Sequence, residues 1–461
     1  MPSLSEKLEA LGVKIGAGEL PSPPPQKESL RDSYSIEKIL NGSYWQTHQG
    51  EVFTVEARYP EGQAYGRAAL AITASLQVLG EWAGDPRLQD LPPQAFAFLD
   101  TETTGLAGGT GTYAFLIGVG RFESSRETSS SEFHLAQFFL RDPVEEPAQL
   151  AAFEEFLAPC QAVVTFNGKA FDVALLSTRF MTHGWQTPFV ELAHVDLLHL
   201  ARRLWRERLP SRTLSNLEAQ IMGALRSEED IPGWMIPGIY FDYLRDGDAR
   251  PLQKVFYHNA MDVLSLAALL DHTAKLLTDP LHLGSQYSVD LISMARLFED
   301  LGDIDTAANL YLHGLEHEDA RTERLPRAVL LQALQRLALI YKRKADWPAA
   351  IQLWKQAAHY HHLHAHLELA KCYEHSFKDY PEAIYWTQSA IELIQTVSGL
   401  EFSTPIDDHL SESTDGSFIL VDHLPSNNAD VELLLTPFER RQWLENFHHR
   451  LSRLQRKLSG S

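Results

Sequence analysis

The chain has 461 residues, too many for one ordinary compact core, so its length predicts two or more domains. Hydrophobic residues make up 44% and charged residues 22%, a balance that excludes wholesale disorder. No run approaches the roughly 18 apolar residues that span a bilayer. The first residues also lack the basic start and apolar core of a secretion signal. We therefore expect a cytoplasmic protein with no membrane partner.

The net charge of -21 opposes long-range attraction to a polyanion, because nucleic-acid affinity usually comes from Lys and Arg neutralising phosphates. A nucleic-acid role therefore needs a local source of positive charge. One is divalent cations bound by clustered carboxylates. Another is a basic run, which is as consistent with a solvated helix face as with phosphate contact: Arg202, Arg203, Arg206, Arg208 and Arg212.

Residues 1–48 include a Pro-rich polar tract and are expected to be a flexible N-terminal region. Residues 49–280 are expected to form one domain. Its predicted strands begin at Gly50 and continue at 95–99, 113–122, 133–140 and 162–166. Its predicted helices cover 147–157, 171–182, 197–208, 214–222 and 252–277. This order predicts an α/β domain with a mixed sheet flanked by helices.

Residues 285–396 lose the strand signals and repeat a helical pattern of small and aromatic residues. Ala307, Ala350 and Ala383 occupy equivalent positions, and the last two are 33 residues apart, close to the roughly 34 of a tetratricopeptide unit. We expect an all-α tetratricopeptide-like repeat domain that can bind a protein partner. The histidines between residues 359 and 366 are interpreted as having structural or surface roles, and not as metal ligands. Residues 397–461 are expected to form an acidic loop followed by a C-terminal helix, 437–458.

The strongest chemical signal is the segment FLDTETTGL, which begins at Phe98. Residues two apart on a strand point the same way, so Asp100 and Glu102 can present two carboxylates to one site. Paired hard oxygens suit Mg²⁺ or Mn²⁺. The Gly-rich stretch after Glu102 is equally consistent with close approach to a nucleotide and with a tight strand connection.

DTETTGL resembles the first motif of the DEDD exonuclease superfamily. NGKAFD, from Asn167 to Asp172, follows a predicted strand and resembles the second motif, and YHNAMDVL resembles the third. The resemblance implies that Asp100, Glu102, Asp172 and Asp262 hold two divalent ions. The alternative for Asn167 and Asp172 is a turn and a helix start.

The third motif departs from both of its usual forms. Three residues separate Tyr from Asp in one subclass and four separate His from Asp in the other, whereas here His258 has the shorter spacing and Tyr257 the longer. Positions four apart share a helix face, so we expect His258 to lie with Asp262 and act as the base, and Tyr257 to point away.

Residues 50–275 resemble the YprB-type ribonuclease H-like family as a whole, and the resemblance also implies appended repeats. It implies a 3'-5' exonuclease acting by a two-metal-ion mechanism on DNA or RNA, at a single-stranded 3' end. Asp196 is interpreted as either a helix N-cap or a group behind the site. The expected substrate contacts are Thr103, Gly105, Leu106, Asn167, Phe171, Arg202 and Arg203. The alternatives are an endonuclease of the same fold and a catalytically silent binding or scaffolding protein acting through its repeats.

Overall fold

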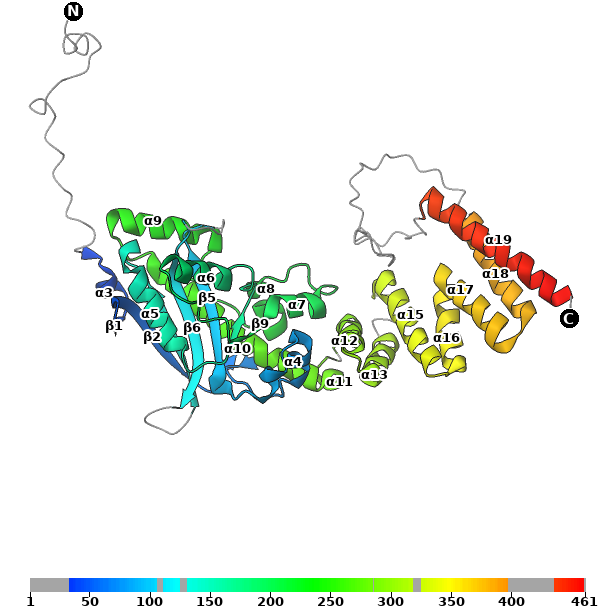
Figure 1. The fold of residues 1–461 in the computed structure, drawn as a ribbon, viewed down its shortest axis with the longest axis horizontal. Helices are drawn as coiled ribbons and strands as arrows, with labels where there is room; N and C mark the ends of the chain where they lie inside the picture. Colours follow the sequence, from blue (N-terminus) through cyan, green and yellow to red (C-terminus); the bar gives the residue numbers. More distant parts are fainter. Residues whose placement is uncertain are drawn as a thin grey trace, which may run out of the picture. The chain divides into compact units, whose positions relative to one another are not determined.

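The computed structural model describes residues 33–105, 111–124, 131–284, 286–317, 325–396 and 435–459. It divides into two compact units, Met1–Leu283 and Gly284–Ser461. In Figure 1 the first unit runs from blue to green and the second from light green to red. The expected acidic loop of residues 401–431 lies outside the described residues.

The first unit is built on a seven-stranded mixed sheet with strand order β1-β2-β7-β6-β5-β8-β9. The strand β5 lies inside the sheet, antiparallel to β6 and parallel to β8, and β8 is parallel to β9. The strands are β1 Ser43–Thr47, β2 Gly50–Pro60, β5 Phe96–Thr103, β6 Ala114–Ser124, β7 Ser131–Phe139, β8 Ala162–Thr165 and β9 Ala193–Asp196. The predicted α/β class with a mixed sheet is confirmed.

Helices cover both faces of this sheet. On one face α5 (Glu146–Leu157) and α6 (Asp172–Thr182) pack through Phe153 and Phe180 against a core that includes Leu99 of β5. On the other, α9 (Ile236–Asp246) and the long α10 (Leu252–Thr278) pack against Phe115 and Phe139. Because side chains alternate along a strand, Asp100 and Glu102 face α10 whereas Leu99 and Thr101 face α6.

Shorter elements complete the first unit. They are α3 Ile36–Ile39, β3 Ala64–Tyr65, β4 Ala68–Ala69, α4 Gln77–Ala83, η2 Pro86–Asp90, η3 Pro93–Ala95, η4 Pro143–Glu145, α7 Leu197–Trp205, α8 Leu214–Leu217, η5 Glu218–Met222, η6 Gly233–Met235 and α11 Pro280–Leu283. The long predicted helix 197–208 ends three residues earlier, at Trp205, and the predicted helix 214–222 widens from α8 into the π-helical turn η5.

The expectation of a flexible region through residue 48 is wrong for residues 43–47, which form the edge strand β1. Two aromatic residues of this segment explain why it forms a strand. Trp45 packs edge-on against Phe138, with ring centroids 5.6 Å apart, and Tyr44 packs against Phe53 at 5.8 Å. This apolar contact extends the sheet by one strand beyond the Pro-rich tract.

The second unit is helical, as predicted. Its elements are α12 Ser288–Leu301, α13 Ile304–Glu316, α15 Arg327–Arg343, α16 Trp347–His359, α17 Leu363–Cys372, η7 Tyr373–Phe377, α18 Tyr380–Thr396 and α19 Pro437–Ser459. The equivalent residues Ala307, Ala350 and Ala383 are fully buried. A Cβ at Gly314 would lie 2.9 Å from a side-chain carbon of Ile292, so this small residue lets α13 approach α12.

A candidate metal centre rich in carboxylates

The centre starts at the end of β5. Phe96 to Leu99 are buried, and this apolar run holds the strand inside the sheet up to Asp100. The register with β6 shifts between Glu102 and Thr103, so regular pairing ends where the carboxylates appear. A bulge at a strand end redirects the neighbouring side chains, a common device beside functional sites.

Asp172 reaches the same strand end from the opposite face. It is the first residue of α6, and its Oδ1 accepts hydrogen bonds from the Thr101 N–H at 3.1 Å and the Thr101 hydroxyl at 2.6 Å. The second motif is thereby tied to the first through Thr101, the residue between the two β5 carboxylates.

Asp196 fixes the turn that carries the second motif. Its carboxylate accepts hydrogen bonds from the backbone N–H groups of Asn167 at 2.7 Å and Lys169 at 3.1 Å, and it caps α7 through Leu198 N–H at 3.1 Å. Both interpretations of Asp196, as an N-cap and as a group behind the site, therefore apply. Asn167 itself has a left-handed backbone with φ 68°, a conformation that Asn tolerates better than most residues.

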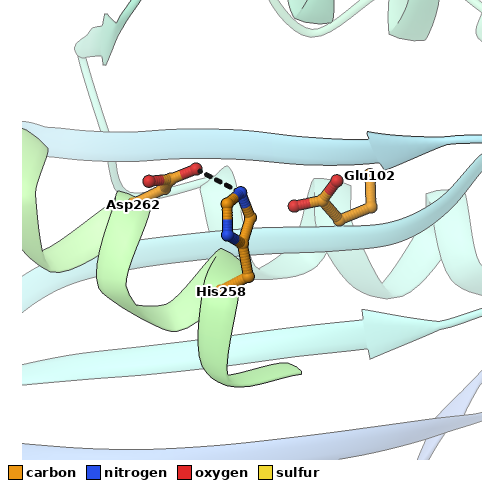
Figure 2. A group of neighbouring side chains, drawn as sticks. All are labelled: Glu102, His258 and Asp262. Atoms are coloured by element: carbon orange, nitrogen blue, oxygen red, sulfur yellow. Dashed lines mark ion pairs between the residues drawn. The ribbon is translucent and has the colours of Figure 1, made fainter. Parts of the chain in front are cut away.

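The helix α10 supplies His258 and Asp262, and Figure 2 shows them facing Glu102 of β5. His258 Nε2 lies 3.4 Å from Asp262 Oδ2. Glu102, His258 and Asp262 each offer one metal-ligand atom, and these atoms all lie within 4.8 Å of one another. Residues four apart on a helix share a face, which explains why one short motif provides two of the three groups.

A buried polar chain holds α10 against the strand. Asn259 Nδ2 donates to Asp100 Oδ2 at 2.9 Å, and Gln137 of β7 donates to the Asn259 Oδ1 at 2.9 Å. Gly118 of β6 makes room for this contact, because a Cβ there would lie 2.1 Å from that same oxygen. Neither Gln137 nor Asn259 carried a signal in the sequence beyond its place in a buried element.

The carboxylates repel one another. Burial, and then the negative charges of Asp262, Glu102 and Asp172, raise the pKa of Asp100 well above its usual range. Burial and the charges of Asp262 and Asp172 do the same to the pKa of Glu102. Burial raises the pKa of Asp172 to about 6, against the lowering effect of the Thr101 hydrogen bonds. All four acids therefore share one electrostatic environment whose negative charge a bound cation would relieve.

Arg226 is a member of this centre that the sequence did not reveal. Its guanidinium, on the segment between η5 and η6, contacts Asp262 and binds Glu218 through Nε at 2.6 Å and Nη2 at 2.9 Å. Glu218 is buried and also accepts from Tyr65 at 2.9 Å and from Ser265. Burial lowers the pKa of Arg226, but its bonds to Glu218 and the charge of Asp262 raise it overall.

His258 and Tyr257 have different partners. His258 Nδ1 lies 2.6 Å from Asp230 Oδ1, so a carboxylate orients the imidazole from behind while Nε2 faces the centre. The Tyr257 hydroxyl accepts a hydrogen bond from Ser227 N–H at 3.0 Å. The helix thus presents the histidine, and not the tyrosine, to Asp262.

The residues expected to contact the substrate lie on several different elements of the first unit. Phe171 is 53% exposed beside Asp172, and the Thr103 hydroxyl donates to the Gly105 carbonyl at 3.1 Å. Leu106 lies outside the described residues. Arg202 and Arg203 lie in the last turn of α7, which places them about 9–10 Å along the helix from Asp196.

An exposed tryptophan near the centre was also missed. Trp234, in η6, is 80% exposed, and a Cβ on the preceding Gly233 would lie 4.0 Å from His258 Nε2. No periodicity marks this residue, because it lies on an irregular connection before α9. With Phe171, it gives the surroundings of the carboxylates two exposed aromatic side chains.

Comparison with known proteins defines the class. A family model described as the RNase H superfamily matches residues 97–274, the span that contains all three motifs. The uncharacterized protein YprB of Bacillus subtilis (strain 168) is 32% identical over 303 residues, covering 64% of this chain and 68% of that protein. The chain therefore belongs to the YprB family of RNase H-like proteins, which places a nuclease-type domain in the first unit.

One solved structure is also similar to part of the chain. It is the family B DNA polymerase of Pyrobaculum calidifontis, matched with 18% identity and a TM-score of 0.31 over 56% of this chain. The match spans one third of the length of the polymerase, 33%. Separately, none of the helices that the structure describes has the length and apolar character needed to cross a membrane.

Proposed function

We propose that this chain is a metal-dependent 3'-5' exonuclease that hydrolyses phosphodiester bonds at a single-stranded 3' end of DNA or RNA. The observation that carries the proposal is the geometry of the centre, in which Glu102 and Asp262 lie beside an oriented His258 while burial and neighbouring negative charges raise the pKa values of Asp100 and Glu102. A fold gains no stability from such a cluster, so its presence favours a binding or catalytic role.

The residues present fit divalent ions. Carboxylate oxygens are the ligands that Mg²⁺ and Mn²⁺ prefer, and Asp100, Glu102, Asp172 and Asp262 would hold them. When bound, two such ions supply an activated water and positive charge that stabilises the transition state of phosphodiester hydrolysis. Arg226 already neutralises part of the charge on Asp262, which leaves the other Asp262 oxygen for a metal.

His258 is the residue that would accept the proton of the attacking water. Histidine changes charge near neutral pH, and here Asp230 holds Nδ1 at 2.6 Å, which keeps Nε2 directed toward Asp262 and Glu102. The same carboxylate would stabilise the imidazolium that forms, because the two groups are in direct contact.

The aromatic residues favour a strand end whose bases are unpaired. Phe171 is exposed directly before Asp172, and Trp234 is exposed directly after Gly233, where a Cβ would lie 4.0 Å from His258 Nε2. Exposed rings beside a phosphodiester site stack on unpaired bases regardless of sequence. They support a single-stranded end as the substrate.

The main rival is an endonuclease of the same fold, because a cluster of metal-binding carboxylates can also cut a strand that has no free end. A 5'-labelled single strand, offered with Mn²⁺, distinguishes them. The exonuclease shortens it from the 3' end one nucleotide at a time and leaves a circular single strand intact. Cutting of the circle would establish the endonuclease. Absence of any hydrolysis would favour a silent binding protein.

A further inference from the structure

A cavity of about 300 Å³ lies between α17 and α19 of the second unit. It is lined by Leu367, Lys371, Trp443, Asn446, Phe447, His449, Arg450 and Arg453. Its volume is at the lower end of the range for small-molecule sites. The described residues of the lining include three permanent cations and no carboxylate, an unusual composition in a chain with a net charge of -21.

The spacing of residues on α19 explains how one helix supplies most of the lining. Asn446, His449, Arg450 and Arg453 follow the i, i+3, i+4, i+7 pattern of a single helix face. Phe447, which is 1% exposed, anchors the helix in an apolar cluster shared with α17 and α18. The polar face is therefore held in place by the core beneath it.

Two carboxylates, of which Glu374 is buried and Glu368 partly exposed, hold these cations in position. Glu374 of η7 is completely buried and contacts Arg450, Arg453 at 2.7 Å and Lys457 at 2.9 Å. Glu368 is shared in the same way by two lysines, Lys342 at 2.6 Å and Lys371 at 2.7 Å. Among the residues that the structure describes, five cations thus share these two carboxylates, an excess of three positive charges within this set of ion pairs.

Arg450 is the most buried of the three permanent cations in the described lining. Its side chain is 13% exposed. Burial, together with the positive charge of Arg453, lowers the pKa of Arg450 even though Glu374 acts in the opposite direction. A largely buried cation is stabilised when an anion binds beside it.

Trp443 adds an aromatic wall to this cationic site. Its ring lies over Phe447 with centroids 5.6 Å apart and an angle of 21°, and His364 contacts it edge-on at 5.0 Å. The ring is therefore fixed and lines the cavity beside the arginines. Arginine and lysine are the usual partners of phosphate, and a fixed tryptophan is a stacking platform for a base.

We propose that this cavity binds a nucleotide of a single-stranded nucleic acid, with Lys371, Arg450 and Arg453 at the phosphate and Trp443 at the base. The choice of a nucleic acid over other anions rests on the proposed function of the first unit. The second unit then supplies the strand affinity that the acidic chain as a whole lacks.

The test measures binding of a fluorescein-labelled single strand to the full chain in EDTA, by anisotropy at several KCl concentrations. Lys371→Glu and Lys371→Gln are the test variants, because Lys371 lines the cavity without contacting Glu374, and Glu368 keeps Lys342 as a partner. Arg441→Glu is the matched control, with the same charge reversal as Lys371→Glu at an exposed position of α19 outside the lining.

We expect Lys371→Glu to raise the Kd at least ~10-fold and to reduce the slope of log Kd against log salt by about 1. Lys371→Gln should have a smaller effect in the same direction, and Arg441→Glu should stay within about twofold of the parent chain. Equal effects of Lys371→Glu and Arg441→Glu, or no effect of either, would overturn the proposal. Tighter, Lys371-dependent binding of a labelled acidic peptide would overturn it in favour of a protein partner.

A separate measurement keeps this result independent of the proposed exonuclease. Hydrolysis of the p-nitrophenyl ester of thymidine 5'-monophosphate by the parent chain with Mn²⁺ tests the first unit without a strand. If the ester is hydrolysed but the variants bind alike, the cavity proposal fails alone. If the ester is stable while Lys371→Glu weakens strand binding, the exonuclease proposal fails alone.

Discussion

Replacing Asp172 by Asn should make the metal-free protein more stable at pH 8. The Asp172 carboxylate is held by Thr101, and an Asn side-chain oxygen can accept the same two hydrogen bonds, at 3.1 and 2.6 Å. The substitution therefore removes a buried negative charge while keeping the hydrogen bonds and the volume of the side chain.

The magnitude follows from the pKa of Asp172, which burial raises from 3.8 to about 6. At about 1.36 kcal/mol per pKa unit, the charged form costs the folded state about 3 kcal/mol. Because the folded pKa is raised, the folded chain keeps the proton longer than the unfolded chain does. Stability therefore falls as pH rises from about 4 through about 6, and it stays low above that.

A smaller electrostatic effect of the charged Asp172 stabilises the folded state. Asp172 is the first residue of α6, where a negative charge interacts favourably with the helix dipole by about 0.3–1 kcal/mol. The net gain in the free energy of unfolding for Asp172→Asn at pH 8 is then about 2 kcal/mol, and it should shrink towards zero near pH 4. Mn²⁺ should stabilise the parent chain more than the variant, since a ligand stabilises the state that binds it.

The assay is urea unfolding at pH 5 and pH 8 in EDTA, read by hydrogen exchange of β5 peptides so that the first unit is followed alone. Asp248→Asn is the control. Its hydrogen bonds to Arg250 lower the pKa of Asp248, so this substitution should reduce stability at pH 8. A loss of stability in Asp172→Asn at pH 8 without metal would refute the reasoning, because the carboxylate would then support the fold.

Two further predictions concern the groups around Asp262. Arg226→Gln should destabilise the first unit by about 3–5 kcal/mol, because it leaves Glu218 buried and unpaired, and the double variant with Glu218→Gln should recover much of the loss in a double-mutant cycle. Strictly additive losses would contradict this coupling. His258→Ala should lower the hydrolysis rate by about 10² to 10⁴, whereas Tyr257→Phe should change the rate little. A large loss in Tyr257→Phe would move the proton-transfer role to the tyrosine.

Much of the fold was predictable because its elements follow simple patterns. The buried runs before Asp100 and after Tyr113 became β5 and β6, and the long apolar periodicity after Leu252 became α10. The site motifs were readable for a related reason. Each motif places a candidate catalytic residue at a strand end or on a helix face, where the local backbone geometry sets the direction of the side chain.

The remaining site residues could not be predicted from the sequence, because their positions depend on the paths of irregular segments through the domain. Arg226 contacts Asp262 across 36 positions of sequence, and Gly233 in the turn η6 brings the backbone before Trp234 near His258. Neither position belongs to a period or a motif. Similarly, the four-residue strand β9 is too short for a clear alternation, so the place of Asp196 beneath the second motif required the parallel pairing of β9 with β8.

The central claim is that Asp100 and its neighbours hold catalytic metal ions. The most direct test is the rate of mononucleotide release from a 3'-labelled single strand, measured for the parent chain and for Asp100→Ala with Mn²⁺ and with EDTA. Asp242→Asn on the exposed face of α9 serves as the control. We expect release by the parent chain and the control with Mn²⁺, none in EDTA, and a loss of at least ~10³-fold in Asp100→Ala. Undiminished release by Asp100→Ala, or by the parent chain in EDTA, would contradict the account.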